Sequence, residues 1–233
     1  MKKYKLTTET LQFAGRTLHR IKAVKDFDSI KAGEFGGWIE NEKNLSQDDN
    51  AWIYGDAMVF DNAEVFDNAS VFGNANVSGN ASVFGNAEVY GNANVFGNAS
   101  VFGNANVFGN ANVSDYAKVY GNANVSDYAN VSDYAEVYGN ANVSDYAKVY
   151  GNAVIKGDAK VHDAVDYIVF KNFWSSGRYF TWTSSNNKWS VGCFYGTGEE
   201  LIKKAYADSE KSGREYERVV RYVESILADE KKG

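Results

Sequence analysis

The chain has 233 residues, of which 44% are hydrophobic and 23% are charged, and its net charge is −6. This composition excludes general disorder and allows a substantial buried core. The single cysteine, Cys193, excludes an internal disulfide and a cluster of thiolates for zinc. No apolar run approaches the roughly 18 residues of a membrane span, and the start lacks the apolar middle of a signal peptide. We therefore expect a cytoplasmic protein without a membrane partner.

Charge is distributed unevenly along the chain. Residues 1–50 and 165–233 each carry a net charge of +1, whereas residues 51–164 hold 12 Asp and Glu against 4 Lys and have no Arg. A segment with this balance repels a phosphate backbone, so we expect no direct binding of nucleic acid. The same acidity leaves a nucleic-acid mimic, or an inhibitor that sequesters a ligand of a host defence, as a further alternative.

Residues 1–50 are expected to form a β cap. The runs "KYKLT" (residues 3–7) and "TLHRIKAV" (residues 17–24) have the composition of strands. Gly36 and Gly37 precede Trp38, a pattern that predicts a tight bend beside a bulky plug. A cap at this end would cover the strand edges that the following segment leaves unpaired.

Residues 51–164 repeat a six-residue pattern. Alanine recurs every six residues from Ala51 to Ala159, and Val or Ile recurs from Ile53 to Val161, which gives nineteen repeats without insertion. A helical period of 3.6 cannot keep such a repeat on one face, whereas the A-x-V spacing puts two side chains on one side of a strand. Most strands are followed by Gly-Asn or Asp-Tyr, and Gly and Asn tolerate the positive φ of a bend. Three such sides make a triangular coil of 18 residues, stacked about six times into a parallel β-solenoid.

This repeat of an aliphatic residue, turn residues and a small residue resembles the hexapeptide-repeat left-handed β-helix. Residues 21–57, "IKAVKDFDSIKAGEFGGWIENEKNLSQDDNAWIYGDA", are similar to the leader of hexapeptide-repeat proteins of enteric bacteria and phages that are often named transferases. The resemblance implies a mainly β fold and a phage-related protein in the cytoplasm of a bacterial host cell. It also implies an activity to test, because hexapeptide-repeat proteins are best known as trimeric acyltransferases in which a histidine deprotonates the acceptor.

The repeat places similar side chains 18 residues apart on the outside of successive coils. We expect an aromatic column on one side and ladders of Asn amides on the other two. The column consists of Phe66, Phe84, Phe102, Tyr120 and Tyr138, and the ladders consist of Asn76, Asn94, Asn112 and Asn130 and of Asn106, Asn124 and Asn142. Lys118 and Glu136 are expected to pair on adjacent coils. The columns either hold the coils in register or dock a partner, because exposed aromatic rows exceed what a monomer usually presents.

Asp-Tyr-Ala replaces Gly-Asn-Ala in four of the later repeats. The tyrosines concerned are Tyr116, Tyr128, Tyr134 and Tyr146, and a serine precedes each Asp-Tyr pair. The exchange moves an aromatic ring from the position before the bend to the bend itself. We expect it to reshape the bends of the later coils.

Residues 165–233 are expected to form a small α+β module. The runs "DYIVFKNF", "RYFTWTSS" and "KWSVGCFYG" indicate an antiparallel sheet of about three strands. Two helices follow, with capping boxes at Thr197 and Glu200 and at Ser212 and Glu215. Four residues of the sheet are candidates for stacking on a ring or a nucleotide, with ordinary sheet packing as the alternative: Trp174, Arg178, Tyr179 and Trp182.

The chain has two histidines, His19 in the leader and His162 at the last repeat. His162 is the candidate general base of an acyltransferase, and a solvated side chain without a catalytic role is the alternative. Two histidines exclude a three-histidine zinc site within one chain, and phosphate-binding loop motifs are absent, so we expect neither a metal nor a cofactor. The sequence favours a non-enzymatic structural or binding protein that associates with itself, a trimer included, or with a host protein. The acyltransferase is the alternative.

Overall fold

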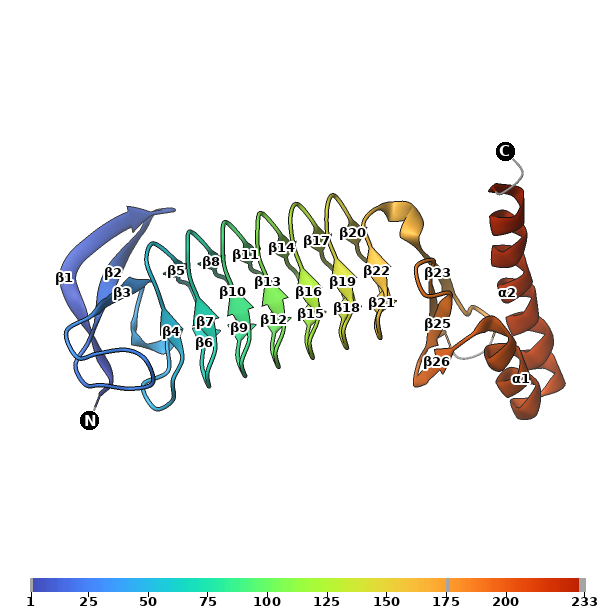
Figure 1. The fold of residues 1–233 in the computed structure, drawn as a ribbon, viewed down its shortest axis with the longest axis horizontal. Coiled ribbons are helices and arrows are strands. Elements are labelled where there is room, and N and C mark those ends of the chain that lie inside the picture. Colours follow the sequence, from blue (N-terminus) through green and yellow to red (C-terminus); the bar gives the residue numbers. More distant parts are fainter. Residues whose placement is uncertain (1, 175–176, 231–233) are drawn as a thin grey trace. The chain divides into compact units, whose positions relative to one another are not determined.

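The computed structural model describes residues 2–174 and 177–230. The chain forms two compact units, residues 1–164 and residues 165–233. The first is a solenoid of parallel strands with an N-terminal cap, and the second combines a small antiparallel sheet with two helices (Figure 1). The predicted fold class, a mainly β parallel β-helix with a β cap and a C-terminal α+β module, is therefore confirmed.

The cap consists of β1 (Tyr4–Phe13), β2 (Arg16–Ala23), β3 (Phe35–Ile39) and the 3-10 helix η1 (Glu42–Asn44). β1 pairs antiparallel with β2, and β2 pairs antiparallel with β3. The bend expected at Gly36 and Gly37 is wrong, since both residues lie inside β3. A Cβ added at Gly37 would lie 2.5 Å from the carbonyl oxygen of Ala57. Glycine is needed here because β3 packs directly against the solenoid.

The solenoid has three sides, each formed by two-residue strands stacked in parallel. The β5 side contains β5 (Met58–Val59), β8 (Asn76–Val77), β11 (Asn94–Val95), β14 (Asn112–Val113), β17 (Asn130–Val131) and β20 (Lys148–Val149). The β6 side contains β6 (Glu64–Val65), β9 (Ser82–Val83), β12 (Ser100–Val101), β15 (Lys118–Val119), β18 (Glu136–Val137) and β21 (Val154–Ile155). The β4 side contains β4 (Trp52–Ile53), β7 (Ser70–Val71), β10 (Glu88–Val89), β13 (Asn106–Val107), β16 (Asn124–Val125), β19 (Asn142–Val143) and β22 (Lys160–Val161).

The solenoid has about seven coils rather than the six expected, because the β4 side contains seven strands. The additional coil begins in the leader. β3 pairs in parallel with β5, and Leu45 bridges in parallel to Val65. These leader residues do not follow the six-residue spacing, so counting repeats did not reveal that they belong to a coil.

Buried Val and Ala side chains fill the solenoid, with the inward residues from Ala51 to Val161 at 0% exposure. Each coil donates backbone hydrogen bonds to the next, as between the Phe102 amide and the Val119 carbonyl at 3.0 Å. Carbonyl groups at the N-terminal end of such a stack need other donors. Lys3 Nζ donates to the carbonyl oxygens of Asp49 and Ala51, both at 2.7 Å. The cap therefore completes the first coil with a buried ammonium group.

The bends keep one backbone conformation throughout the solenoid. Glycines at the bends have φ of 60° to 78°, and Asp115, Asp127, Asp133 and Asp145 have φ of 56° to 59°. The expectation that Asp-Tyr reshapes the later bends is therefore wrong. Asp is among the few residues that adopt the left-handed conformation at modest cost. It also helps the next coil, because Asp133 Oδ2 accepts a hydrogen bond from the amide of Gly151 at 2.9 Å.

The 3-10 helix η2 (Ala164–Asp166) begins at the last residue of the first unit, and the second unit contains a sheet of four antiparallel strands rather than about three. The strands are β23 (Tyr167–Lys171), β24 (Tyr179–Thr183), β25 (Lys188–Val191) and β26 (Phe194–Gly196). The run "KWSVGCFYG" had been expected as one strand, but it turns at Gly192, which has φ of 56°. Phe180, Trp189 and Leu201 are among the buried residues of the core between sheet and helices.

The helices are α1 (Gly198–Asp208) and α2 (Glu210–Glu230). The capping box of Thr197 and Glu200 is confirmed. The box expected at Ser212 is wrong, because α2 begins earlier and Ser209 Oγ accepts a hydrogen bond from the Ser212 amide at 3.1 Å. Within the described ranges, neither helix is both long and apolar enough to cross a membrane.

Candidate functional site

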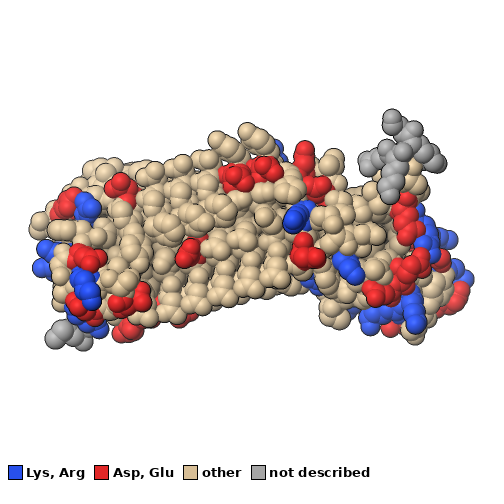
Figure 2. Space-filling model, viewed as in Figure 1, with Lys and Arg blue, Asp and Glu red and all other residues tan. Residues whose placement is uncertain are grey.

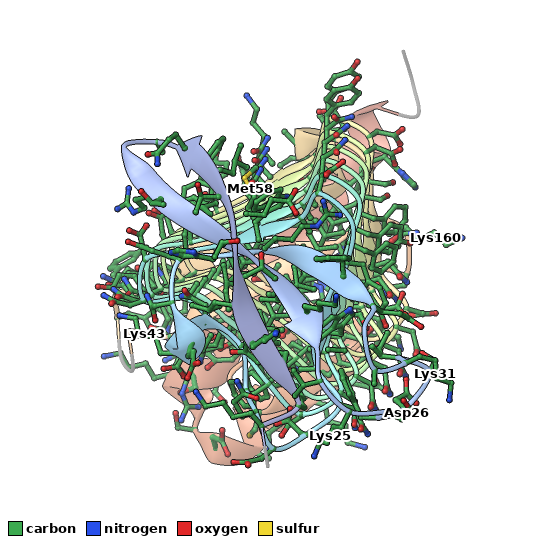
Figure 3. All side chains as sticks on the ribbon, turned by 90° about the vertical axis from the view of Figure 1, so that its left-hand side faces the viewer. Lys25, Asp26, Lys31, Lys43, Met58 and Lys160 are labelled. Carbon is green, nitrogen blue, oxygen red and sulfur yellow. The ribbon has the colours of Figure 1, made fainter. Side chains whose placement is uncertain are left out.

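His162 directly follows β22, the last strand on the β4 side of the solenoid. The view down the solenoid from its cap shows Lys160 of β22 pointing outwards, with Met58 and Lys43 pointing outwards in two other directions (Figure 3). The His162 side chain is 51% exposed. The candidate base therefore lies at the surface of one side, in the last coil.

Two residues of the preceding coil hold the His162 ring. Its Nδ1 lies 3.0 Å from Oδ2 of Asp145 and 2.8 Å from Oγ of Ser144. Since a carboxylate can only accept, we assign the proton of the neutral ring to Nδ1 and the lone pair to Nε2. Asp145 thus orients the imidazole, and its charge would stabilise the imidazolium that forms when Nε2 takes a proton.

The 18-residue repeat explains why these side chains meet. Ser144 and His162 occupy equivalent positions in successive coils, after Val143 and Val161. Asp145 adopts the left-handed bend conformation, with φ of 56°, next to this position. Sequence reasoning selected His162 but missed both partners. The sequence does indicate these partners, because counting back 18 residues from His162 reaches the Ser-Asp pair of the last Asp-Tyr-Ala repeat.

The second histidine lies elsewhere. His19 is on β2 in the cap, at the opposite end of the solenoid from β22 (Figure 1), and its Nδ1 is 3.3 Å from the carbonyl oxygen of Thr7. In residues 2–174 and 177–230, no group of three His, Cys, Asp or Glu side chains is arranged to hold a metal ion.

The predicted aromatic column is a continuous stack on the β6 side. From Phe66 through Phe84, Phe102 and Tyr120 to Tyr138, successive ring centroids are 4.8, 4.9, 4.8 and 4.5 Å apart. These rings are half-buried because each covers its neighbours. Burial raises the pKa of the Tyr120 hydroxyl, and the negative charge of Glu136 acts in the same direction. Whether the column binds a partner stays a prediction.

The Asn ladders form in part. Side-chain amides of Asn76 and Asn94 donate to Asn94 and Asn112, and that of Asn106 donates to Asn124, each at 3.2 Å. The second ladder ends there, because Asn142 Oδ1 has no hydrogen-bond partner among the residues that the structure describes. A longer ladder at the bends was missed: it links Asn50, Asn68, Asn86, Asn104, Asn122 and Asn140. The predicted pair of Lys118 and Glu136 is confirmed, with 3.5 Å between Nζ and Oε1.

The four candidates of the C-terminal sheet do not form one surface. Trp182 is 2% exposed in the core, and Trp174 packs against the same core. Arg178 is exposed and lines a pocket of about 40 Å³ with Cys193 and Lys204. This volume is far below the roughly 300 Å³ at which ligand pockets begin, so it cannot enclose a nucleotide. Stacking on Arg178 and half-buried Tyr179 stays a prediction.

Part of the chain is similar to a known protein. No protein-family model matches the chain. A segment is 39% identical over 62 residues to the uncharacterized acetyltransferase YdcK of Escherichia coli strain K12, and the match covers 23% of this chain. It covers 19% of that relative, so the chain corresponds to less than a fifth of the relative's length. This partial similarity and the stacked coils together fit a hexapeptide-repeat β-helix.

Proposed function

We propose that the protein is an acyltransferase of the hexapeptide-repeat class with His162 as its general base. The observation that carries this proposal is the 3.0 Å contact between His162 Nδ1 and Asp145 Oδ2. A general base needs the correct tautomer and access to its substrate. The contact with Asp145 supports the first requirement, and the 51% exposure of the His162 side chain supports the second.

In the proposed reaction, His162 Nε2 takes the proton from a hydroxyl or amine of the acceptor while the oxygen or nitrogen attacks the carbonyl carbon of an acyl thioester. The carbon–sulfur bond then breaks. The leaving thiolate takes the proton that His162 carries, which returns the base to its neutral form. Asp145 stabilises the imidazolium between the two proton transfers.

The nature of the acyl group rests on the relative. Its name as an acetyltransferase supports an acetyl thioester as donor. Because the match covers 19% of that protein, both the donor and the acceptor of this chain are part of the proposal. The acceptor is defined by its reacting group, a hydroxyl or an amine.

The direct test is acceptor-dependent release of thiol from acetyl-coenzyme A, measured for the full chain with a panel of hydroxyl and amine acceptors. His162→Ala should lower kcat by about 10² to 10⁴, the usual contribution of a general base. His19→Ala is the matched control, because it removes the histidine of the cap and should leave kcat unchanged. Equal turnover by the wild type and His162→Ala would remove His162 from the mechanism.

Asp145→Asn tests the role of Asp145 as a positioning residue. Without the carboxylate, the imidazolium of His162 loses its stabilising charge, so kcat should fall. KM should change little, because Asp145 is not proposed to touch the substrate. An unchanged kcat would show that Asp145 is only a structural neighbour.

A second candidate function is the non-enzymatic binding protein that the sequence favoured. It is supported by the stacked aromatic rings on the outside of the solenoid. Light scattering at micromolar concentration should then show an oligomer that dissociates in Phe84→Ser/Phe102→Ser. A monomeric wild type would contradict self-association through this column. The phage relationship inferred from the leader stays a prediction.

A further inference from the structure

Exposed tyrosines flank one side of the solenoid in its later coils. Tyr128 and Tyr146 lie at the bends before β17 and β20, and Tyr116 and Tyr134 lie at the bends after β14 and β17. Their exposures are 53%, 73%, 52% and 60%. The rings are stacked in pairs, with centroids 5.2 Å apart for Tyr128 and Tyr146 and 5.0 Å apart for Tyr116 and Tyr134. We call β14, β17, β20 and these four tyrosines the tyrosine-flanked side.

The conformation of the bends does not depend on these tyrosines. The bends keep the left-handed conformation of the Gly-Asn bends, as the φ values above show. The serine before the bend is buried in three of the four repeats, with Ser114 at 8%, Ser126 at 5% and Ser144 at 7% exposure. The four tyrosine rings lie at the exposed bend position that follows these serines. Exposed apolar surface of this kind is a mark of an interaction site.

An aspartate precedes each of these tyrosines and has one oxygen available for a ligand. In three of them, Oδ2 accepts hydrogen bonds within the solenoid, as from the Gly151 amide to Asp133 and from Ser126 Oγ to Asp127 at 2.8 Å. In Asp145, Oδ2 contacts His162. Within residues 2–174 and 177–230, the other oxygen, Oδ1, of these four aspartates has no hydrogen-bond partner. Four rings and four carboxylate oxygens therefore face solvent along two edges of one side.

The surroundings of these groups indicate the charge of the partner. Residues 51–164 have 12 acidic side chains, 4 lysines and no arginine. In the view of Figure 2, charged side chains gather over the cap and the C-terminal helices, and most of the solenoid surface between β4 and β22 is uncharged. Asn130 and Ser132, on and after β17, are uncharged as well. On this side, β20 adds the exposed Lys148 to the four aspartates, so its charge is net negative.

We propose that the tyrosine-flanked side binds an arginine-bearing segment of a protein partner. A guanidinium group stacks on aromatic rings and pairs with carboxylate oxygens, and this side offers the two groups next to each other four times. Tyr128 and Tyr134 are six residues apart across β17, a span of at most about 20 Å, which an extended peptide of similar length can cross. The proposal does not rest on the proposed acyl transfer, although Asp145 belongs to both sites.

The test replaces Asp-Tyr bends by the Gly-Asn bend that other repeats of this chain contain. In the full chain, Asp127→Gly/Tyr128→Asn/Asp133→Gly/Tyr134→Asn converts two Asp-Tyr bends to Gly-Asn bends and leaves Asp145 and His162 in place. The probe is a short fluorescent peptide with four arginines, and the same peptide with neutral citrulline is its control. Fluorescence anisotropy at about 50 and 150 mM salt separates binding from screened charge attraction. The control variant Asn104→Ser/Asn122→Ser changes a different row of bends, on the far edge of the β6 side.

We expect the arginine peptide to bind the wild type and the control variant equally, and the four-residue variant at least tenfold more weakly, which corresponds to about 1.4 kcal/mol. The variant Tyr128→Asn/Tyr134→Asn, which keeps the carboxylates, should bind the arginine peptide at least threefold more weakly than the wild type. Equal binding of the citrulline peptide, or unchanged binding by either tyrosine variant, would overturn the proposal. If sedimentation shows an oligomer that only the four-residue variant dissociates, the occupant is a second copy of this chain, and the proposed partner is wrong.

Discussion

The substitution Phe102→Ser should destabilise the solenoid more than Phe96→Ser. Both phenylalanines follow an inward Val of the repeat, and serine occupies the same position in other repeats, so the exchange is compatible with the coil. The two sites differ in their neighbours. Phe102 stacks on Phe84 and Tyr120, whereas serine occupies the positions 18 residues before and after Phe96, and Phe96 is 41% exposed.

The magnitude follows from the two stacked contacts of Phe102. Its ring centroid is 4.9 Å from that of Phe84 and 4.8 Å from that of Tyr120, with interplanar angles of 3° and 2°. An aromatic pair contributes about 0.5 to 1.5 kcal/mol beyond buried area. Phe102→Ser should therefore lower the free energy of unfolding by about 1 to 3 kcal/mol more than Phe96→Ser does, since Phe96 has no stacked ring to lose.

Hydrogen exchange measures this difference where it arises. The two units of the chain can unfold separately, so a single global transition is a poor measure, whereas amide exchange reports the opening of individual coils. In Phe102→Ser, the amides of residues 100–104 should exchange faster than in the wild type, by about 5-fold or more. In Phe96→Ser, the amide exchange rates in the coil of residue 96 should increase by a smaller factor. Equal acceleration at the two sites would refute the argument that stacking stabilises the column.

Three further predictions concern the cap and the tyrosines. Burial raises the pKa values of Tyr4 and Tyr120 above their ordinary value of 10.0. The unfolded chain therefore loses these protons first, so urea unfolding should become easier above pH 10, and less so in Tyr4→Phe. Gly37→Ala should lower the free energy of unfolding by about 1 to 3 kcal/mol, measured by thermal or urea unfolding, because the new methyl group would meet the Ala57 carbonyl. Lys3→Met should also lower the free energy of unfolding by about 1 to 3 kcal/mol, because two carbonyl groups lose their hydrogen-bond donor. The amides of the first coil should then exchange faster. A stable Lys3→Met variant with unchanged exchange would show that the ammonium does not hold the cap.

The repeat made much of the solenoid predictable. A spacing of six residues fixed the short strands, and a spacing of 18 placed Phe102 beside Phe84 and Lys118 beside Glu136. These features depend only on period, which is visible in one sequence. The bend conformation of Asp133 was misjudged because the exchange of Gly-Asn for Asp-Tyr looks large in sequence, although both residue types reach positive φ.

Features that depend on contacts between different elements were not predictable. Gly36 and Gly37 look like a bend in sequence, and only the packing of β3 on the first coil shows that they are strand residues without room for a side chain. Ser209 caps α2 because α1 ends at that residue. The residues around Ser212 alone do not show where α1 ends. The contact of Asp145 with His162 depends on side-chain direction at a bend as well as on register.

In the proposed function, His162, held by Asp145, acts as a base in acyl transfer. The most direct measurement is mass spectrometry of the acceptor after incubation of the full chain with isotope-labelled acetyl-coenzyme A, carried out for the wild type and for His162→Gln. Labelled acetyl groups should appear on a hydroxyl or amine acceptor with the wild type, and the yield should be at least about 100-fold lower with His162→Gln. Labelling by the wild type that does not exceed the enzyme-free reaction, or equal labelling by His162→Gln, would contradict this function.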